Sequence, residues 1–476
     1  MSMHQSRPLK RAAAIAVALF LAGCASVTPT QSIQAVNGAT QPFVGDAVDL
    51  RTTDVVRQDA RTRVDALLEK PLSQADAVRV MLLNSPAFQT LLAQGVADTA
   101  AAAQGGRILN PSISIERMTS VADAELTRVL SFGLLDLLTL PQRQEIAAHA
   151  VDASQLQLAA GVVRAVAQVK QAWVEAVAAA AAEDYAGQVM RSANASATLA
   201  ARMQRTGNLT VLERSSQQMY AADAAVGLAA ARHQRQRTRE ALIRLLGLRP
   251  DQQASFTLPK RLPALPKAPR AVDDINAQLV TARLDVKLSA LMLNHAAKAQ
   301  GLGDITSFTD IEWGIRQTKT TDRTDGAVSR STGNEISVKL PLFDWGDLQR
   351  SRMASQTLAA INAYESAVLN ASSEVREAYA AYRTTFDIAK HYTEEIIPLR
   401  QLMTEENQYR YNGMMIGTLE LLADARMQVG VVQSALKASE QFWLAEASLA
   451  ESLISSPSGG VAIQATGASP ANAGGH

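Results

Sequence analysis

The sequence repeats itself at long range, and this repeat constrains the fold more than any other feature. VKQAW at 169–173 matches VREAY at 375–379, and Gly207 interrupts a helical pattern just as Gly413 does, 206 residues further on. A chain of 476 residues would by length alone suggest about three domains. The repeat instead predicts two similar halves, 72–248 and 272–455, built into one body.

Each half contains a very long helical arm. Gln142 to Thr206 is rich in alanine and free of proline, so about 65 residues in a helix would reach roughly 100 Å. Val162, Val166, Val169 and Trp173 follow the alternating spacing of four and three that is typical of a coiled-coil seam. Equivalent positions in the second half are Val368, Ser372, Val375 and Tyr379.

A return arm follows each glycine, over about 210–246 and 418–454, and an earlier arm runs from the N-cap Ser73 to about Gln104. Pro86 is expected to kink that earlier arm. Four segments of alternating polarity lie between the arms and predict strands, at about 112–118, 125–134, 307–317 and 333–342. Each half therefore has the order helix, strand, strand, long helix, bend, helix.

The N-terminus carries the most specific short motif. Basic residues and an apolar run lead into LAGC, which is typical of a secretory signal (1–23) that ends in a lipobox. Cys24, the only cysteine, is expected to be acylated, with fatty acids such as palmitate, and 24–71 is expected to be a weakly patterned tether. The proline-rich stretch 249–271 is expected to be an extended linker, and the tail 456–476 to be disordered.

Composition and motifs exclude several function classes. With 46 basic and 45 acidic residues, the chain shows no basic excess for nucleic-acid binding. We find no nucleophile motif, phosphate-binding loop or cofactor fingerprint, so neither an enzyme nor a cofactor is expected. The histidines lack metal-ligand spacing, and Met414 and Met415 are better explained as packing or partner contacts than as a copper path.

Four strands cannot close a membrane barrel, since single-chain barrels begin at about eight strands and an open edge cannot face lipid. The residues therefore predict a mainly α protein whose strands join those of other copies. At this point the sequence resembles the TolC-like outer-membrane factors of tripartite efflux and secretion systems. The resemblance rests on LPLFDWG at 340–346, on YRYNGMMIGTLELLADAR at the second bend, and on the repeat itself.

The resemblance implies a homotrimer in the outer membrane of a Gram-negative bacterium. Its twelve-stranded transmembrane β-barrel would continue into a periplasmic α-helical barrel, and it would meet a periplasmic adaptor protein and an inner-membrane pump. Gly207, Gly413, Gly417 and Tyr411 would lie at the periplasmic tips, where the adaptor binds and where glycine permits φ > 0.

The same resemblance makes Glu420, Asp424 and Arg410 candidates for the periplasmic gate. Glu420 and Asp424 lie four residues apart, and like charges at that spacing do not stabilise a helix. The alternative is a solvated outer face neutralised by Arg410 and Arg426. Two other functions stay open, an exit duct for type I protein secretion and a lipid-anchored coiled-coil adaptor.

Overall fold

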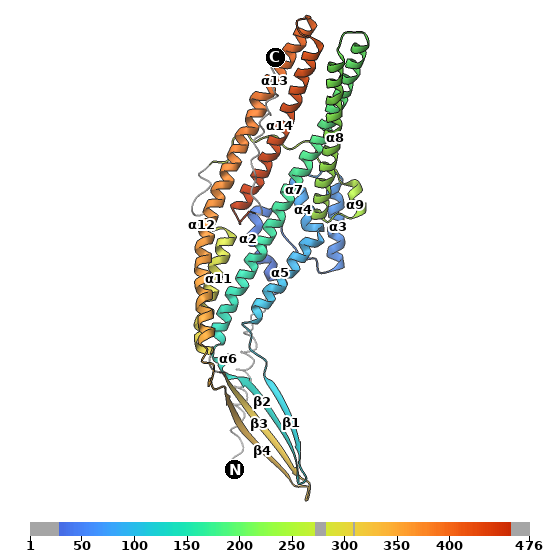
Figure 1. Cartoon of the computed structure of the whole chain (residues 1–476). Helices are drawn as coiled ribbons and strands as arrows, with labels where there is room; N and C mark the ends of the chain where they lie inside the picture. Colours follow the sequence, from blue (N-terminus) through green and yellow to red (C-terminus); the bar gives the residue numbers. More distant parts are fainter. Residues whose placement is uncertain (1–27, 272–281, 308–309, 458–476) are drawn as a thin grey trace. The chain divides into compact units, whose positions relative to one another are not determined.

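The structure, a computed structural model, describes residues 28–271, 282–307 and 310–457 (Figure 1). The chain divides into two compact units, each assembled from separate stretches of sequence. Unit 1 comprises Met1–Val36, Gln94–Leu158 and Asp285–Val368, and unit 2 comprises Asn37–Ala93, Ala159–Leu284 and Leu369–His476. Cys24 and most of the C-terminal tail lie outside the described residues.

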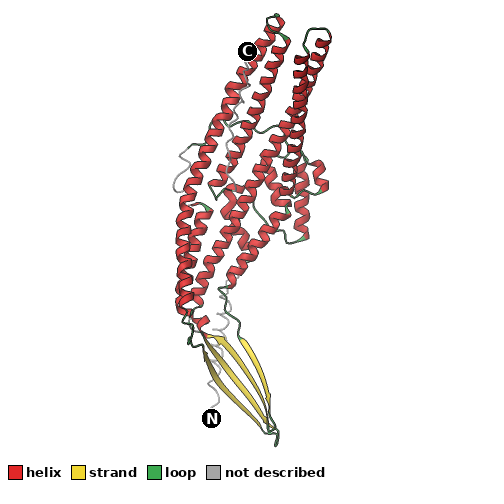
Figure 2. Cartoon of the chain, viewed as in Figure 1, coloured by secondary structure: helices red, strands yellow, loops and turns green. Residues whose placement is uncertain are grey.

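Unit 1 contains the predicted strands, paired as one antiparallel sheet in the order β1-β2-β3-β4 (Figure 2). The bounds are β1 (Ser112–Thr119), β2 (Asp123–Gly133), β3 (Ile311–Asp322) and β4 (Val328–Val338). The second hairpin reaches further toward its own turn than the alternation indicated. Its outer part is rich in Thr and Ser, whose polarity hides the pattern, and cross-strand pairing extends the strands there.

Unit 1 also contains helices that precede or follow the strands along the chain. They include α6 (Leu134–Leu138), α11 (Leu284–Thr306) and the first parts of α7 (Leu140–Arg205) and α12 (Asp347–His391). Lys298 of α11 forms an ion pair with Glu145 of α7 at 2.9 Å. The Thr357 hydroxyl of α12 donates to the Ala296 carbonyl of α11.

Unit 2 contains the two helical hairpins. The first joins the end of α7 to α8 (Val211–Leu246), and the second joins α12, the π-helical η2 (Tyr392–Ile396) and α13 (Ile397–Asn412) to α14 (Thr418–Ser452). The predicted seam is buried at Val162, Val166, Val169 and Trp173, which are 0–3% exposed. In the second hairpin, three aromatic rings fill the corresponding core, those of Tyr382, Phe386 and Phe442.

The segment expected to be a tether forms two helices, α2 (Pro29–Val44) and α3 (Asp54–Leu68). Thr53 caps α3, which buries Ala60, Val64 and Leu68 at a spacing of four. The Lys170 ammonium lies 4.0 Å from the centre of the Phe43 ring. The expectation of a weakly patterned tether is therefore wrong, since α3 places three of its apolar residues on one buried face.

Pro86 separates two helices instead of kinking one, because α4 (Gln74–Asn84) ends before it and α5 (Pro86–Gln104) begins with it. Ser73 caps α4 as predicted. Ser85 between the two helices is extended, as expected for a residue that precedes proline.

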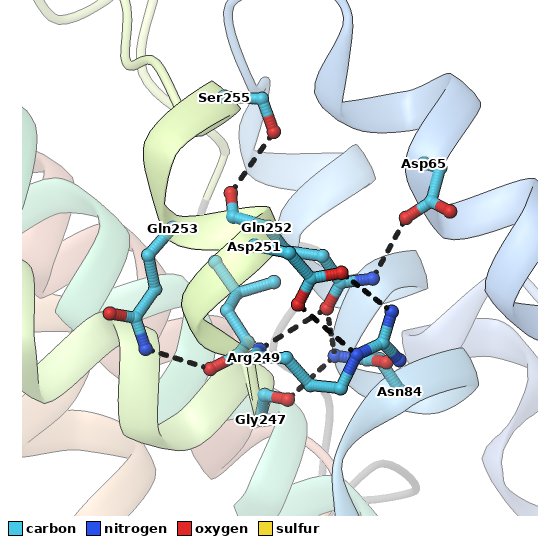
Figure 3. Close-up of polar contacts among 9 residues, drawn as sticks. Asp65, Asn84, Gly247, Arg249, Asp251, Gln252, Gln253 and Ser255 are labelled. Carbon is cyan, nitrogen blue, oxygen red and sulfur yellow. Dashed lines mark hydrogen bonds and ion pairs between the residues drawn. The ribbon is translucent and has the colours of Figure 1, made fainter.

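The linker does not run extended throughout, since its first part forms α9 (Pro250–Ser255) and closes a polar junction (Figure 3). The buried Asn84 amide donates to the Gly247 carbonyl at 2.7 Å and to Gln252 Oε1. Gln252 in turn donates to Asp65 of α3 at 2.9 Å. Gly247 has φ +66°, and an added Cβ would lie 2.6 Å from Pro86, so only glycine fits there.

Candidate functional site

At the end of the sheet near the helices, the register places the large apolar side chains on one face. Directly paired residues of antiparallel strands point to the same face, so the pairing assigns each strand residue to one side. One side, here the apolar face, carries Ile113, Ile115, Leu130, Phe132, Ile311, Trp313, Ile315, Ile336 and Val338. The rings of Phe132 and Trp313 stack at 6.2 Å. Ile113 and Ile336 are each 67% exposed, so large apolar side chains face outward and the described residues leave them uncovered.

The opposite side, here the polar face, is hydrogen-bonded across the strands. The hydroxyls of Thr127 and Thr318 lie 3.1 Å apart, and those of Ser112 and Ser131 lie 2.7 Å apart. The Arg316 guanidinium forms an ion pair with Glu335 at 2.8 Å. A sheet with one apolar and one hydrophilic face is suited to separate hydrocarbon from water.

Both outer strands of this sheet have an unpaired edge. β1 pairs only with β2, and β4 pairs only with β3, within the described sheet. A strand edge presents unsatisfied N–H and C=O groups, which are costly in hydrocarbon. The sheet is therefore incomplete as a membrane-facing structure unless further strands join both edges.

The first hairpin tip ends as predicted, with a glycine in the left-handed region. Gly207 has φ +79°, and the N–H groups of Gly207 and Asn208 donate to the carbonyls of Gln204 and Met203. This pair of bonds is a Schellman motif. Thr210 then caps α8 in a capping box with Glu213, and hydrogen bonds from Thr210 lower the pKa of the Glu213 carboxyl.

At the second tip, the prediction that Gly413 supplies the positive φ is wrong. Gly413 has φ −80°, whereas Met414 has φ +58°. The N–H groups of Met414 and Met415 complete the same motif with the carbonyls of Tyr411 and Arg410. Met414 is therefore the structural counterpart of Gly207, one residue later than the sequence match suggested.

This shift assigns a local role to the other tip residues. Gly417 corresponds to Thr210 and occupies the N-cap of α14 with φ −85° and no side-chain hydrogen bond. Glu420 corresponds to Glu213, in the first turn of the helix, where a carboxylate is favoured by the helix dipole. The Tyr411 hydroxyl lies 3.4 Å from that of Thr418 across the bend.

Asp424 is buried inside the second hairpin. Its Oδ1 accepts hydrogen bonds from Arg400 Nη2 at 2.6 Å and from Asn407 Nδ2 at 2.9 Å. The side chains of Arg400 and Asp424 are 8% and 4% exposed. Contrary to the expectation that these two carboxylates do not stabilise the helix, each has a favourable local contact. Asp424 could face a channel only if its ion pair with Arg400 broke.

Neither arginine expected to neutralise this acidic pair does so. Arg410 is exposed, and Arg426 donates to Gln217 Oε1 at 2.6 Å while its guanidinium lies 4.2 Å from the centre of the Tyr220 ring. Arg426 thereby joins α14 to α8 within unit 2. The sequence reading missed Arg400, Asn407 and Tyr220, because helix periodicity does not reveal which faces of two hairpins meet.

Two further observations concern membranes and metals. No helix in the described part of the chain is both long and apolar enough to cross a membrane. Among the described residues, no three His, Cys, Asp or Glu side chains are grouped so that they could hold a metal ion.

Comparison with known proteins identifies relatives of this architecture. Residues 306–412, which include LPLFDWG, match the family described as outer membrane efflux protein. A membrane protein from Pseudomonas aeruginosa has a similar structure, with 20% identity, a TM-score of 0.65, and coverage of 85% of this chain and 95% of that chain. A search of curated proteins gives no significant match.

Two similar structures are described as outer membrane channels. The CmeC channel of Campylobacter jejuni has 13% identity and a TM-score of 0.65, and the match covers 86% of this chain and 89% of that one. The open-state MtrE channel of Neisseria gonorrhoeae has 19% identity and a TM-score of 0.63, with 82% and 88% covered. At these identities the likeness establishes the fold, and with the family match it confirms the expected resemblance.

Proposed function

We propose that this chain, a TolC-like outer-membrane factor by its fold and by its match to the outer membrane efflux proteins over residues 306–412, is the exit duct of a tripartite efflux system. It would pass small molecules passively, because an inner-membrane pump supplies the energy and a periplasmic adaptor joins the two. The observation that carries the proposal is the two-faced sheet, whose exposed apolar side suits lipid and whose hydrophilic side suits a water-filled channel.

Assembly as a homotrimer follows from the same sheet. Three copies of a four-stranded sheet would pair every open edge and give twelve strands. Native mass measurement in detergent tests this assembly, and a stable monomer would contradict it. The hairpin tips that contain Gly207, Gly413, Gly417 and Tyr411 are proposed as the adaptor contacts, and Glu420 with Arg410 remains a candidate for the gate.

The lipid anchor is a separate part of the proposal. Cys24 stands at the cleavage position of a lipobox and would carry the acyl chains. Labelled fatty acid should enter the wild-type chain and not Cys24→Ser. Equal labelling of both proteins would rule out this anchor.

Export assays in a strain that lacks this protein test the function directly. The deletion should raise the accumulation of some dyes, antibiotics or metal salts inside the cells, and a plasmid copy of the gene should restore their export. A deletion that changes none of these but blocks secretion of a protein would favour the type I secretion duct instead. Purified protein should also form conducting channels in planar bilayers.

A further inference from the structure

Four basic side chains lie together on the apolar face of the sheet, at the end far from the helices. The register pairs Arg117 with Leu126, Leu126 with Lys319, and Lys319 with Arg330, so these residues form one row across all four strands. Arg128 occupies the adjacent row on the same face, opposite Ile115. All four cations are exposed.

The carboxylates of the described strands are confined to one face of the sheet. The same register places every strand carboxylate on the polar face, namely Glu116, Asp123, Glu125, Glu312, Asp322 and Glu335. The one strand arginine on that face, Arg316, pairs with Glu335. The four cations of the apolar face therefore share their side with no strand carboxylate, and some other anion is needed to neutralise them.

At the other end of the apolar face, β4 is followed by an exposed loop that contains aromatic residues. Phe343 and Trp345 in the segment LPLFDWG are 98% and 63% exposed. This loop is held in place, because Asp344 Oδ1 accepts from the Gly346 N–H at 2.8 Å and Gly346, with φ +71°, packs against Ser307. An exposed Phe and Trp beside the end of a strand are typical of the aromatic girdle where a barrel meets the membrane interface.

The spacing between these two features fits one membrane. Arg330 and Val338 are eight residues apart on β4, about 27 Å along the strand and roughly 20 Å at a tilt of 40°. The exposed loop beyond Val338 supplies the remainder of the apolar band, which is about 25 Å tall in outer-membrane barrels. The basic row thus lies where the headgroups of the outer leaflet would begin.

We propose that Arg117, Arg128, Lys319 and Arg330 bind the phosphate groups of anionic lipid in the outer leaflet. Guanidinium groups match phosphate oxygens in pairs, and clustered cations beside an apolar surface recognise anionic headgroups. A second copy of the chain is a poorer occupant, because Arg128 and Lys319 lie on the two inner strands, away from the edges where copies would pair. The inference rests on the proposed membrane location.

The test measures how tightly diphosphorylated lipid A binds to the detergent-solubilised full-length protein. Native mass spectrometry compares this binding between the wild type and its variants. The variant R117Q/R128Q/K319Q/R330Q should bind this lipid at least tenfold more weakly than wild type. The matched control R316Q/E335Q removes an ion pair from the polar face and should bind normally. Equal binding by wild type and the quadruple variant would overturn the proposal.

Two further measurements test the proposal even if the quadruple variant does not fold. R117K/R128K/R330K preserves the charge and should retain most binding, and high salt should weaken binding to the wild type. The proposal would be overturned if the affinity of the wild type for the lipid did not change at high salt or after removal of the lipid phosphates. The proposal would also be overturned if the quadruple variant no longer formed an oligomer but still bound lipid normally. The four cations would then stabilise contacts between copies of the chain.

Channel recordings separate this inference from the proposed function. Wild-type protein that conducts in planar bilayers but does not prefer phosphorylated lipid would overturn the lipid site alone. If the protein forms no channel, the proposed duct is overturned. Lipid binding in detergent would still show whether the four basic residues bind phosphorylated lipid.

Discussion

At the scale of single residues, the two hairpin tips share one backbone motif but differ at its critical position. Gly207 adopts φ +79° without strain, whereas Met414 adopts φ +58° with a side chain. A side chain in the left-handed region costs roughly 1–2 kcal/mol. We expect Met414→Gly to slow hydrogen exchange of the second-tip amides about fivefold, by making local opening about 1 kcal/mol less favourable.

Two glycines provide the control for this prediction. Gly207→Ala should speed exchange at the first tip, because it introduces the strain that Met414 already has. Gly413→Ala should be close to neutral, since its φ is −80° and an added Cβ would meet only ordinary contacts at 3.5–3.8 Å. A strong effect of Gly413→Ala with none from Met414→Gly would contradict this assignment.

The buried pair of Arg400 and Asp424 leads to a second prediction at this scale. Asp424→Leu leaves the Arg400 guanidinium buried without its carboxylate, and such a loss costs about 3–5 kcal/mol. The double variant Arg400→Leu with Asp424→Leu should recover much of that stability, because no buried charge remains. Glu420→Gln, at an exposed site, should change little.

Hydrogen exchange of the amides of α13 and α14 measures the loss of stability in both the single and the double variant. If the single and double variants open equally, the two side chains do not depend on each other and the ion pair contributes little. Channel recordings of the single variant would also report whether the pair limits opening of the hairpin.

At the scale of secondary structure elements, the seam spacing predicted the long helices and the alternation of polarity predicted all four strands. Local geometry set by tertiary contacts was not predictable in this way. The helices α2 and α3 were not predicted, although α3 buries three apolar residues spaced by four, and the positive φ of Met414 contradicts the usual preference for glycine. The paired partner of Asp424 depends on how α13 meets α14, which no single helix encodes.

The two hairpins also differ in continuity. α7 runs without interruption for 66 residues, whereas the outgoing helix of the second hairpin contains the π-helical segment η2. Pro398 follows this segment and lacks an N–H to continue the α-helical bonding, while the Ile397 N–H donates to the Tyr392 carbonyl. The second hairpin is therefore expected to open more easily at this level than the first.

Pro398→Ala tests this expectation. The substitution restores a donor and allows regular helix through 392–398, so exchange of these amides should slow roughly fivefold, or about 1 kcal/mol. The corresponding stretch of α7, near Arg191, serves as an internal reference in the same protein. Faster exchange around Tyr392 in the variant would show that the π-turn is stabilised by its surroundings and is not a weak point imposed by proline.

At the scale of the whole molecule, the register of the sheet determines what a closed assembly would present to each side. Alternation within a strand was visible in the sequence, but the faces of separate strands could be combined only once the pairing was known. The segregation of carboxylates onto the polar face is thus a property of the assembled sheet. In a homotrimer each of these residues would occur three times around the channel.

This arrangement predicts cation preference, to which Glu116 and Glu125 should contribute because, unlike Glu335, neither forms an ion pair within the described sheet. Rings of carboxylates attract cations and repel anions inside a pore. In planar bilayers under a potassium chloride gradient, E116Q/E125Q should shift the reversal potential toward zero relative to wild type. R316Q/E335Q, which removes one charge of each sign from the same face, should leave it nearly unchanged. Unaltered selectivity in E116Q/E125Q would mean that the polar face does not line the conducting path, and the sidedness of the sheet would have to be reversed.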